Sequence, residues 1–257
     1  MASSTDMTPP GLPAPRVVDV GGGWCVFVGL GTPRDVSDEA MASWVGEAVT
    51  AARALGGHHL GTRPIAAAVN APYRKALEGA GFRYRGDRVE FKAPVSDLPG
   101  DEGSPITWRS MLDVGEAAAA AALALAAESD PHGLSPDDEP LDVIRGYLAE
   151  PNLIGAADCV QVGYLDGALA AFVCAQVDPS DGWSRVTYMG VVPSLRGRGL
   201  GRWVHRKGFA LMKAQGGREY HGGTAAENPA MLQLFREHGC EEKWRMAEWD
   251  MKLGGAE

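Results

Sequence analysis

Hydrophobic positions along the chain recur with two periods, and segments with one period alternate with segments of the other. Short apolar runs bounded by glycine, proline or aspartate predict strands, and apolar residues three and four positions apart predict helices. The expected strands are Trp24–Val28, Pro64–Val69, Arg83–Ala93, Ile106–Arg109, Cys159–Leu165, Ala168–Val177, Arg185–Val192, His221–Ala225 and Lys243–Leu253. The expected helices are Asp38–Leu55, Asn70–Gly81, Asp113–Ala127, Leu141–Leu148, Leu200–Lys213 and Pro229–His238. This order predicts a mixed α/β (α+β) fold.

Local signals define several of these elements. Asp38 and Asp113 are expected to cap the helices that follow them, because aspartate is favoured at helix N-caps. Asp166-Gly167 predicts a tight hairpin turn between two strands. Gly86-Asp87 marks a possible turn, so Arg83–Ala93 is either one strand or a hairpin.

The C-terminal order of elements also occurs earlier in the chain. Asn70 stands before Gly81 at the same distance as Asn228 stands before Gly239, and the same offset aligns Glu90 with Glu248. An internal duplication explains this most simply. The alternative is that unrelated helices share the same end signals by chance.

The duplication and the composition together predict four segments. Residues 1–16 form a flexible lead-in without the basic and apolar regions of a signal peptide, and residues 96–104 form a polar linker rich in proline and glycine. Residues 17–95 are expected to be a degenerate half-domain, and residues 105–257 a complete domain. The half-domain is expected to serve a structural role or to form part of the substrate wall.

The stretch Val191–Lys213 carries the strongest functional signal. It predicts the end of a strand, a loop with Gly197, Gly199 and Gly201, and then a helix. Free main-chain amides in such a loop and at a helix N-terminus bind anions, and nearby arginines favour the same ligand. The spacing matches neither the P-loop nor the dinucleotide-binding fingerprint. The predicted ligand is a phosphate or pyrophosphate; the alternative is a glycine turn beside surface arginines.

Arg196-x-x-Gly199-x-Gly201, preceded by Val191-Val192-Pro193, resembles the acyl-CoA-binding motif of the GNAT N-acetyltransferase superfamily. The resemblance covers about residues 105–253 and implies the GNAT fold, a mixed and mostly antiparallel sheet whose two central strands splay apart to admit acetyl-CoA. The whole chain is similar to tandem members of the family, with a truncated N-terminal half. The implied cofactor-binding residues are Val191, Val192, Arg196, Gly197, Arg198, Gly199, Leu200, Gly201, Arg202, Asn228 and Phe235.

The resemblance also implies the chemistry, which is direct acetyl transfer to a primary amine in a ternary complex. Main-chain groups of Val191 and Val192 match the family segment that faces the thioester oxygen, and Asn228 matches a pantetheine contact or is simply a helix cap. Phe235 stands where the family often has a tyrosine that protonates the thiolate, a role that a phenyl ring cannot fill.

Three residues are candidates for deprotonating the amine, and each has a simpler explanation. Tyr188 is otherwise a packing residue, Glu227 favours the adjacent helix N-terminus, and His221 begins its strand and need not reach the cleft. Members of the family often use ordered water for this step instead.

Charge narrows the choice of partners. The net charge of −9 argues against nucleic acid and suits a cationic amine, small or peptidyl. An acidic loop that carries Glu128, Asp130, Asp137, Asp138 and Glu139 is expected either to attract that amine or to be simply solvated. The rival functions are an acyl-CoA-binding scaffold without catalysis and an acyltransferase for longer acyl-CoA.

Cysteine usage and hydropathy complete the expectations. Cys25, Cys159, Cys174 and Cys240 are scattered, so neither a metal site nor a disulfide framework is expected, and Cys159 and Cys174 are expected to be core thiols. No apolar run is long enough to cross a membrane, and the expected location is the cytoplasm. The expected oligomeric state is a monomer or a homodimer.

Overall fold

The structure is a computed structural model that describes residues 12, 14–21, 23–28, 36–66, 69–130, 133–134, 138–149 and 157–254. Most of the expected lead-in, and parts of the predicted strand at Pro64–Val69 and of the acidic loop, lie outside these residues. The described chain forms two compact units. Unit 1 contains the residues up to Glu90, Thr224–Asn228 and the residues from Lys243 onward, whereas unit 2 contains Phe91–Gly223 and Pro229–Glu242.

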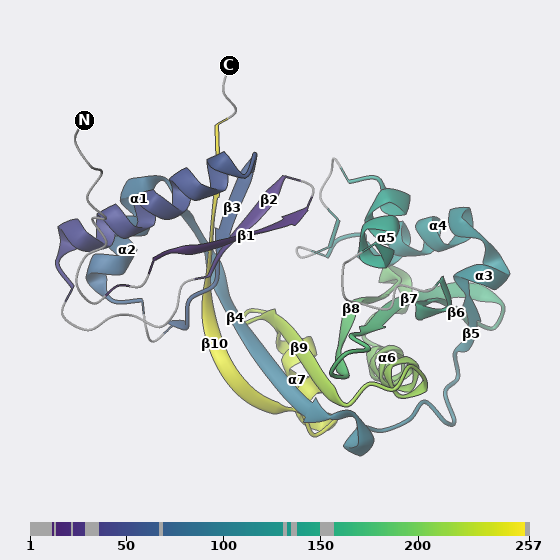
Figure 1. The fold of residues 1–257 in the computed structure, drawn as a ribbon. Helices are drawn as coiled ribbons and strands as arrows, with labels where there is room; N and C mark the ends of the chain where they lie inside the picture. Colours follow the sequence, from purple (N-terminus) through teal and green to yellow (C-terminus); the bar gives the residue numbers. More distant parts are fainter. Residues whose placement is uncertain are drawn as a thin grey trace. The chain divides into compact units, whose positions relative to one another are not determined.

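Unit 1 is built on a sheet whose strand order is β1-β2-β3-β10-β4 (Figure 1). The strands are β1 (Arg16–Gly21), β2 (Trp24–Val28), β3 (His59–Thr62), β4 (Arg83–Pro94) and β10 (Glu241–Lys252), the last two shared with unit 2. β1 and β2 are antiparallel, β2 and β3 are parallel, and β3 and β10 are antiparallel.

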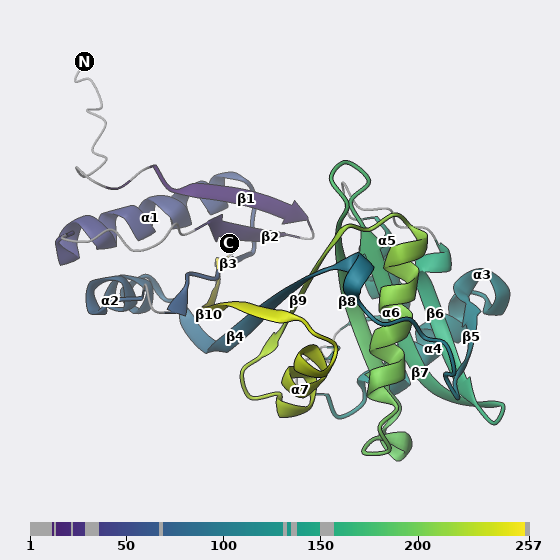
Figure 2. The same cartoon turned by 90° about the horizontal axis from the view of Figure 1, so that it is seen from below.

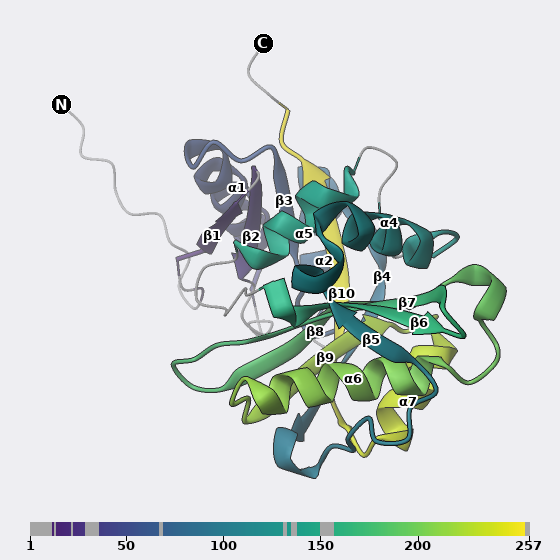
Figure 3. The same cartoon turned by 90° about the vertical axis from the view of Figure 1, so that its right-hand side faces the viewer.

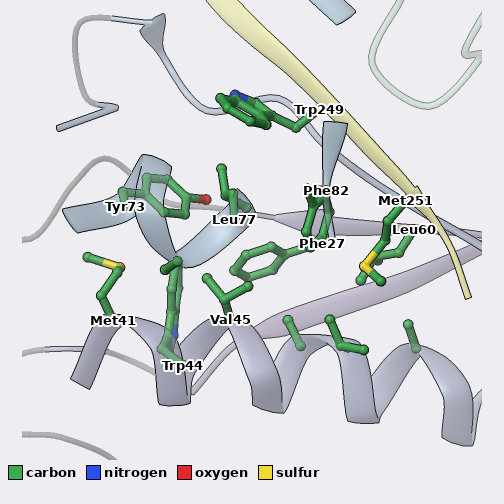
Figure 4. Packing of buried hydrophobic residues seen from close by; sticks show 14 of the residues in the cluster. Phe27, Met41, Trp44, Val45, Leu60, Tyr73, Leu77, Phe82, Trp249 and Met251 are labelled. Carbon is green, nitrogen blue, oxygen red and sulfur yellow. The ribbon is translucent and has the colours of Figure 1, made fainter. Parts of the chain in front are cut away.

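Helices α1 (Asp38–Ala54) and α2 (Ala71–Ala80) form the core of unit 1 together with one face of this sheet. α1 contributes Trp44 and Val45, which pack near Phe27 of β2 (Figure 4). Trp249 and Met251 of β10, close to the end of the chain, belong to the same buried cluster. The core of unit 1 is therefore made from both ends of the sequence.

Unit 2 contains the strand order β9-β8-β7-β6-β5, with β4 on the other side of β9. Its strands are β5 (Thr107–Ser110), β6 (Val160–Leu165), β7 (Ala168–Val177), β8 (Trp183–Val191) and β9 (Glu219–Ala225). β5 to β8 are joined by antiparallel pairing, and β8 and β9 are parallel. The sheet is therefore mixed and mostly antiparallel, as the sequence predicted.

Helices cover both faces of this sheet. They are α3 (Met111–Val114), α4 (Glu116–Ala127), α5 (Pro140–Leu148), α6 (Gly201–Ala214) and α7 (Pro229–Glu237), with short 3-10 turns at Val95–Asp97, Ala157–Cys159 and Pro193–Leu195. α3, α4 and α5 lie on one side of β5 to β8 and α6 on the other (Figure 3). α6 runs along β7 and β8 (Figure 2), so closely that a Cβ on Gly208 would lie 2.5 Å from Cγ2 of Val186.

Several predicted boundaries are wrong for local reasons. The cap of α1 is Ser37, whose hydroxyl accepts from the Ala40 amide, so Asp38 is instead the first helical residue. Ser110 caps α3 in a capping box with Asp113, and Gly115 at φ +83° separates α3 from α4. Asp113 is therefore the reciprocal partner in the capping box and not the cap.

Two predicted strands also differ from the observed ones. The strand expected at Pro64–Val69 lies earlier, as β3, and Ile65 forms only an isolated bridge to Met246. β4 is a single continuous strand, so the hairpin alternative at Gly86-Asp87 is wrong. The hairpin turn at Asp166-Gly167 is confirmed, with φ of +50° and +80°.

The pairing of the last strands supports a duplication. β4 and β10 have the same length of 12 residues and similar burial patterns, and each follows a helix that ends in a left-handed glycine, Gly81 or Gly239. β3 pairs with β10, which comes much later in the chain, while β4 lies between β10 and β9. β10 thus lies beside β3 and β4 beside β9, the arrangement expected if two copies had exchanged their last strands.

The cysteines all lie in the interior. All four are buried thiols, as expected for Cys159 and Cys174. The described residues contain no cluster of three or more His, Cys, Asp or Glu that could hold a metal ion. Within the described part of the chain, none of the helices combines the length and apolar character needed to span a lipid bilayer.

Candidate functional site

The parallel strands β8 and β9 pair only where they begin. Trp183 pairs with Glu219 and Ser184 with Tyr220, and no further pair joins the described residues of these two strands. The remaining part of β8 forms ladder pairs with β7. An interior strand with one unpaired edge leaves hydrogen-bonding groups for a ligand.

The corresponding strands of unit 1 stay together. β2 and β3 pair continuously from Trp24 opposite His59 to Phe27 opposite Thr62. α1, which follows β2, carries Asp38 and Glu39 in its first turn. Carboxylates there disfavour an anion at the helix N-terminus. Unit 1 thus has neither the strand separation of unit 2 nor a helix start suited to phosphate.

Hydrogen-bond alternation identifies which groups of β8 face the unpaired edge. The Val192 amide donates to the Ala170 carbonyl at 2.9 Å, so it points toward β7. In an antiparallel ladder consecutive residues point to opposite neighbours, which puts the main-chain groups of Val191 and Met189 on the open edge. Only Val191, of the adjacent pair predicted from the sequence, therefore has an amide on this edge. Met189 was not among the sequence-based candidates, although the period-two alternation of a strand could have indicated it.

The loop after β8 presents a row of free amides. Gly197 and Gly199 adopt φ of +74° and +73°, a left-handed conformation that favours glycine. The main-chain N–H groups from Gly197 to Arg202 have no acceptor among the described residues, and no side chain caps α6. Six amides without acceptors at the start of a 14-residue helix are groups that can bind an anion, so the anion site stays a prediction that this geometry suits.

A cavity of about 540 Å³ adjoins this loop. Its lining residues are Val191, Leu195, Arg196, Gly197, Gly199, Leu200, Gly201, Arg202, Ala230, Gln233, Leu234 and Glu237. The loop and the first turn of α6 form one wall, and α7 forms another. The α7 residues were not among the sequence-based candidates, because nothing local in the sequence reports which helix lies opposite the loop.

The three arginines near the loop are not equivalent. Arg196 donates to the carbonyls of Val191, Ala126 and Glu128 at 2.7–3.1 Å. These bonds tie the loop to β8 and satisfy carbonyls at the end of α4. Because its guanidinium makes these three bonds, Arg196 holds the loop in position. Arg202 lies close to Gly199, where a Cβ would be 3.5 Å from its guanidinium, and Arg198 is exposed outside the cavity lining.

Tyr188 occupies the central part of β8, beside a β-bulge at Thr187. Its hydroxyl donates to the Asp130 carboxylate at 3.1 Å. Burial, followed by the negative charge of Asp130, raises the pKa of Tyr188 well above its usual value. The phenol therefore stays protonated at neutral pH, which is the wrong state for a general base.

The other two candidate bases lie elsewhere. His221 bonds to the Glu219 carboxylate, and its ring centroid is 5.3 Å from that of Trp183, at the paired end of β8 and β9. With about 3.3 Å per strand residue, the start of β8 is more than 20 Å from Val191. Glu227 is exposed and belongs to unit 1. Asn228 also belongs to unit 1, and its main-chain N–H donates to the Ala225 carbonyl.

Phe235 lies in the core of unit 2. It is 1% exposed and stacks on Phe91 with ring centroids 4.4 Å apart. It is absent from the lining of the cavity, whose α7 residues are Ala230, Gln233, Leu234 and Glu237. A phenyl ring suits this position because it has no polar atom to satisfy.

Comparison with known proteins agrees with this geometry. Residues 120–240 match the model of the acetyltransferase (GNAT) family. No curated protein sequence matches the chain.

Solved structures share the fold at low sequence identity. A GCN5-related N-acetyltransferase from Sphaerobacter thermophilus aligns with a TM-score of 0.64 and 16% identity, over 94% of this chain and 77% of that one. A GCN5-related N-acetyltransferase from Kribbella flavida aligns with a TM-score of 0.57 and 17% identity, over 94% of this chain and 91% of that one. A tandem GNAT protein from the clavulanic acid biosynthesis pathway aligns with a TM-score of 0.55 and 13% identity, over 95% of this chain and 79% of that one.

Proposed function

We propose, from the premise that residues 120–240 belong to the GNAT acetyltransferase family, that this protein is an N-acetyltransferase that uses acetyl-CoA. The observation that carries the proposal is the separation of β8 from β9 beside a loop of six unpaired amides. The acceptor in this proposal is a primary amine, small or peptidyl, and the transfer is direct within a ternary complex.

The residues present fit the cofactor. The amides from Gly197 to Arg202 suit a pyrophosphate, and the charge of Arg202 adds to the positive end of the α6 dipole. The open edge of β8 offers the main-chain groups of Met189 and the amide of Val191, whose carbonyl already accepts from Arg196, and these groups suit the amides of a pantetheine arm. The cavity volume of about 540 Å³ falls in the usual range for cofactor pockets.

Acetyl-CoA, when bound, supplies an acetyl group activated as a thioester. The chain's own part is to orient that group and to stabilise the charge that develops on its oxygen. A preorganised N–H on the open edge of β8 is a donor of the required kind. Because main-chain groups carry this role, the side chains of Met189 and Val191 need only be apolar.

The protonation steps involve few residues of this chain. Tyr188 remains protonated, so removal of the amine proton falls to water or to a carboxylate such as Asp130. Asp130 lies beside β8 through its bond with Tyr188, and a carboxylate there favours a cationic amine as substrate. A CoA thiolate is a good enough leaving group to depart without a dedicated acid, which agrees with phenylalanine at position 235.

Binding is tested with the Gly199→Glu variant. The glutamate places bulk and negative charge beside the amide row, so acetyl-CoA binding should be lost in calorimetry. Gly199→Ala is the matched control, because it introduces the cost of a left-handed non-glycine residue without charge. Unchanged affinity in Gly199→Glu would refute this position for the pyrophosphate.

Catalysis is tested by the release of free thiol from acetyl-CoA with a panel of primary amines. Turnover with at least one amine is expected, and it should vanish in Gly199→Glu. Tight CoA binding without turnover would favour the scaffold alternative, which Phe235 and the closed strands of unit 1 motivate. Faster turnover of longer acyl-CoA would favour the second alternative.

A further inference from the structure

Unit 1 contains a second cavity, of about 440 Å³, outside the segment that matches the GNAT family. Its lining residues are Trp24, His59, Gly81, Arg83, Arg85, Asp250, Met251 and Lys252. It lies where β2, β3 and the end of β10 run side by side. None of its residues takes part in the function proposed above.

An exposed aromatic pair forms part of the wall. The indole of Trp24 stacks on the imidazole of His59, with centroids 4.3 Å apart and an interplanar angle of 13°. Trp24 is nevertheless 43% exposed, which is unusual for so large an apolar side chain. Trp24 is paired with His59 and His59 with Lys252, so the three side chains lie on one face of the sheet.

The charges of the lining are unbalanced. Arg85 forms a two-pronged ion pair with Asp250, with N–O distances of 2.9 Å, which cancels one positive charge. Arg83 and Lys252 have no ion-pair partner among the residues that the structure describes. The cavity thus carries two uncompensated positive charges in a chain whose net charge is −9.

We propose that this cavity binds a phosphate monoester that carries a flat aromatic ring, of the nucleoside monophosphate class. A phosphate monoester has close to two negative charges at neutral pH, which matches Arg83 and Lys252. The exposed indole of Trp24 offers a surface on which a heteroaromatic base stacks. A cavity with charge alone or with aromatic surface alone would not select this combination.

The test is calorimetric titration of the full chain with AMP, adenosine and inorganic phosphate. AMP should bind at least tenfold more tightly than either fragment. Because CoA itself contains an adenine nucleotide, the titrations are repeated in the Gly199→Glu variant. Retained AMP binding there places the site outside the loop beside α6, as the proposal requires, whereas loss of binding would assign it to that loop and overturn the proposal. This readout does not depend on acetyl transfer.

Two variants locate the site. Arg83→Gln combined with Lys252→Gln should weaken AMP binding at least tenfold, and Trp24→Leu at least fivefold. Arg53→Gln and Trp244→Leu are matched controls, since both residues are exposed in unit 1 and outside the lining, and binding should stay within twofold. Equal affinity for AMP and phosphate, or variants that bind AMP like the wild type, would overturn the proposal.

Discussion

The main-chain groups of single residues decide what β8 can bind. The sequence predicted Val191 and Val192 as neighbours with one role, but strand geometry separates them. The Val192 amide donates to the Ala170 carbonyl, and the main-chain groups that face the open edge belong to Val191 and Met189. The loop with its glycines and the arginine motif could be recognised from the sequence. The strand pairing that decides whether an amide faces β7 or the open edge is non-local, so the sequence could not predict it.

Tyr188 provides a test at the same scale. Since burial and Asp130 raise the pKa of Tyr188, the phenol does not act as a base at neutral pH. Tyr188→Phe is therefore expected to lower kcat/KM by less than tenfold. The rise of kcat/KM with increasing pH should remain as in the wild type. The measurement is kcat/KM from pH 6 to 9, with the amine that gives the fastest turnover.

Asp130→Asn serves as the comparison, because it removes the carboxylate to which Tyr188 donates. A larger rise in KM is expected for this variant with a cationic amine. A loss of more than a hundredfold in Tyr188→Phe, with a flat profile, would instead identify the tyrosine as the base.

At the level of elements, a buried polar cluster joins α6 to the end of α7. His205 of α6 contacts the Tyr220 hydroxyl through Nε2 at 2.9 Å, and its Nδ1 lies 3.0 Å from Nδ1 of His238. Only one proton fits between the two nitrogens, so the rings cannot both be cationic in this arrangement. α6 and α7 also form walls of the first cavity, which links this contact to the shape of the proposed cofactor site.

The cluster makes stability depend on pH. Burial lowers the pKa of His238 to about 4, and the charges of Arg206 and Arg202 add to this effect while Glu237 opposes it. Burial, followed by the charge of His238, also lowers the pKa of His205 well below its usual value. The unfolded chain takes up protons below about pH 6.5 while the folded chain does not. The stability contributed by neutral His238 is therefore lost as pH falls from about 6.5 to 4, by about 2 kcal/mol at pH 5.

Urea unfolding at pH 7.5 and pH 5 measures this effect. The free energy of unfolding should fall less in His238→Gln than in the wild type over the same interval, because glutamine does not titrate. Most carboxylates stay ionised in this window, so they contribute little to the difference. Equal losses in the two proteins would contradict the assignment.

Element types were more predictable than element boundaries. α2 was correct because its signals are local: Asn70 accepts from the Tyr73 amide and Gly81 ends the helix at φ +95°. α3 and α4 were predicted as one helix, because a single glycine, Gly115, does not reveal its positive φ in the sequence. β3 was misplaced because His59–Thr62 is barely apolar in sequence, and its pairing with β2 and β10 makes it a strand.

At the scale of the whole molecule, the places of β4 and β10 matter most. Trp249 and Met251 of β10 complete the core of unit 1, and Phe91 of β4 stacks on Phe235 in unit 2. The sequence predicted a duplication with a linker between the copies. It could not predict which copy each last strand joins, because β4 and β10 have nearly the same pattern.

A cut in the linker tests this arrangement. A protease site introduced after Gly103, which is exposed, should give two pieces that stay together in size-exclusion chromatography under native conditions. Each piece supplies a strand that the other needs. The intact chain with the same insertion is the control, and two pieces that separate as folded monomers would contradict the expectation.

The separation of β3 and β10 along the sequence has a consequence for biosynthesis. The edge of β3 that β10 covers is made early, but β10 begins only at Glu241, about 180 residues after β3 ends. At ordinary rates of translation this interval is roughly ten to forty seconds. An unpaired strand edge exposed for that long attracts other chains. The nascent protein is therefore expected to depend on a chaperone until β10 has been made.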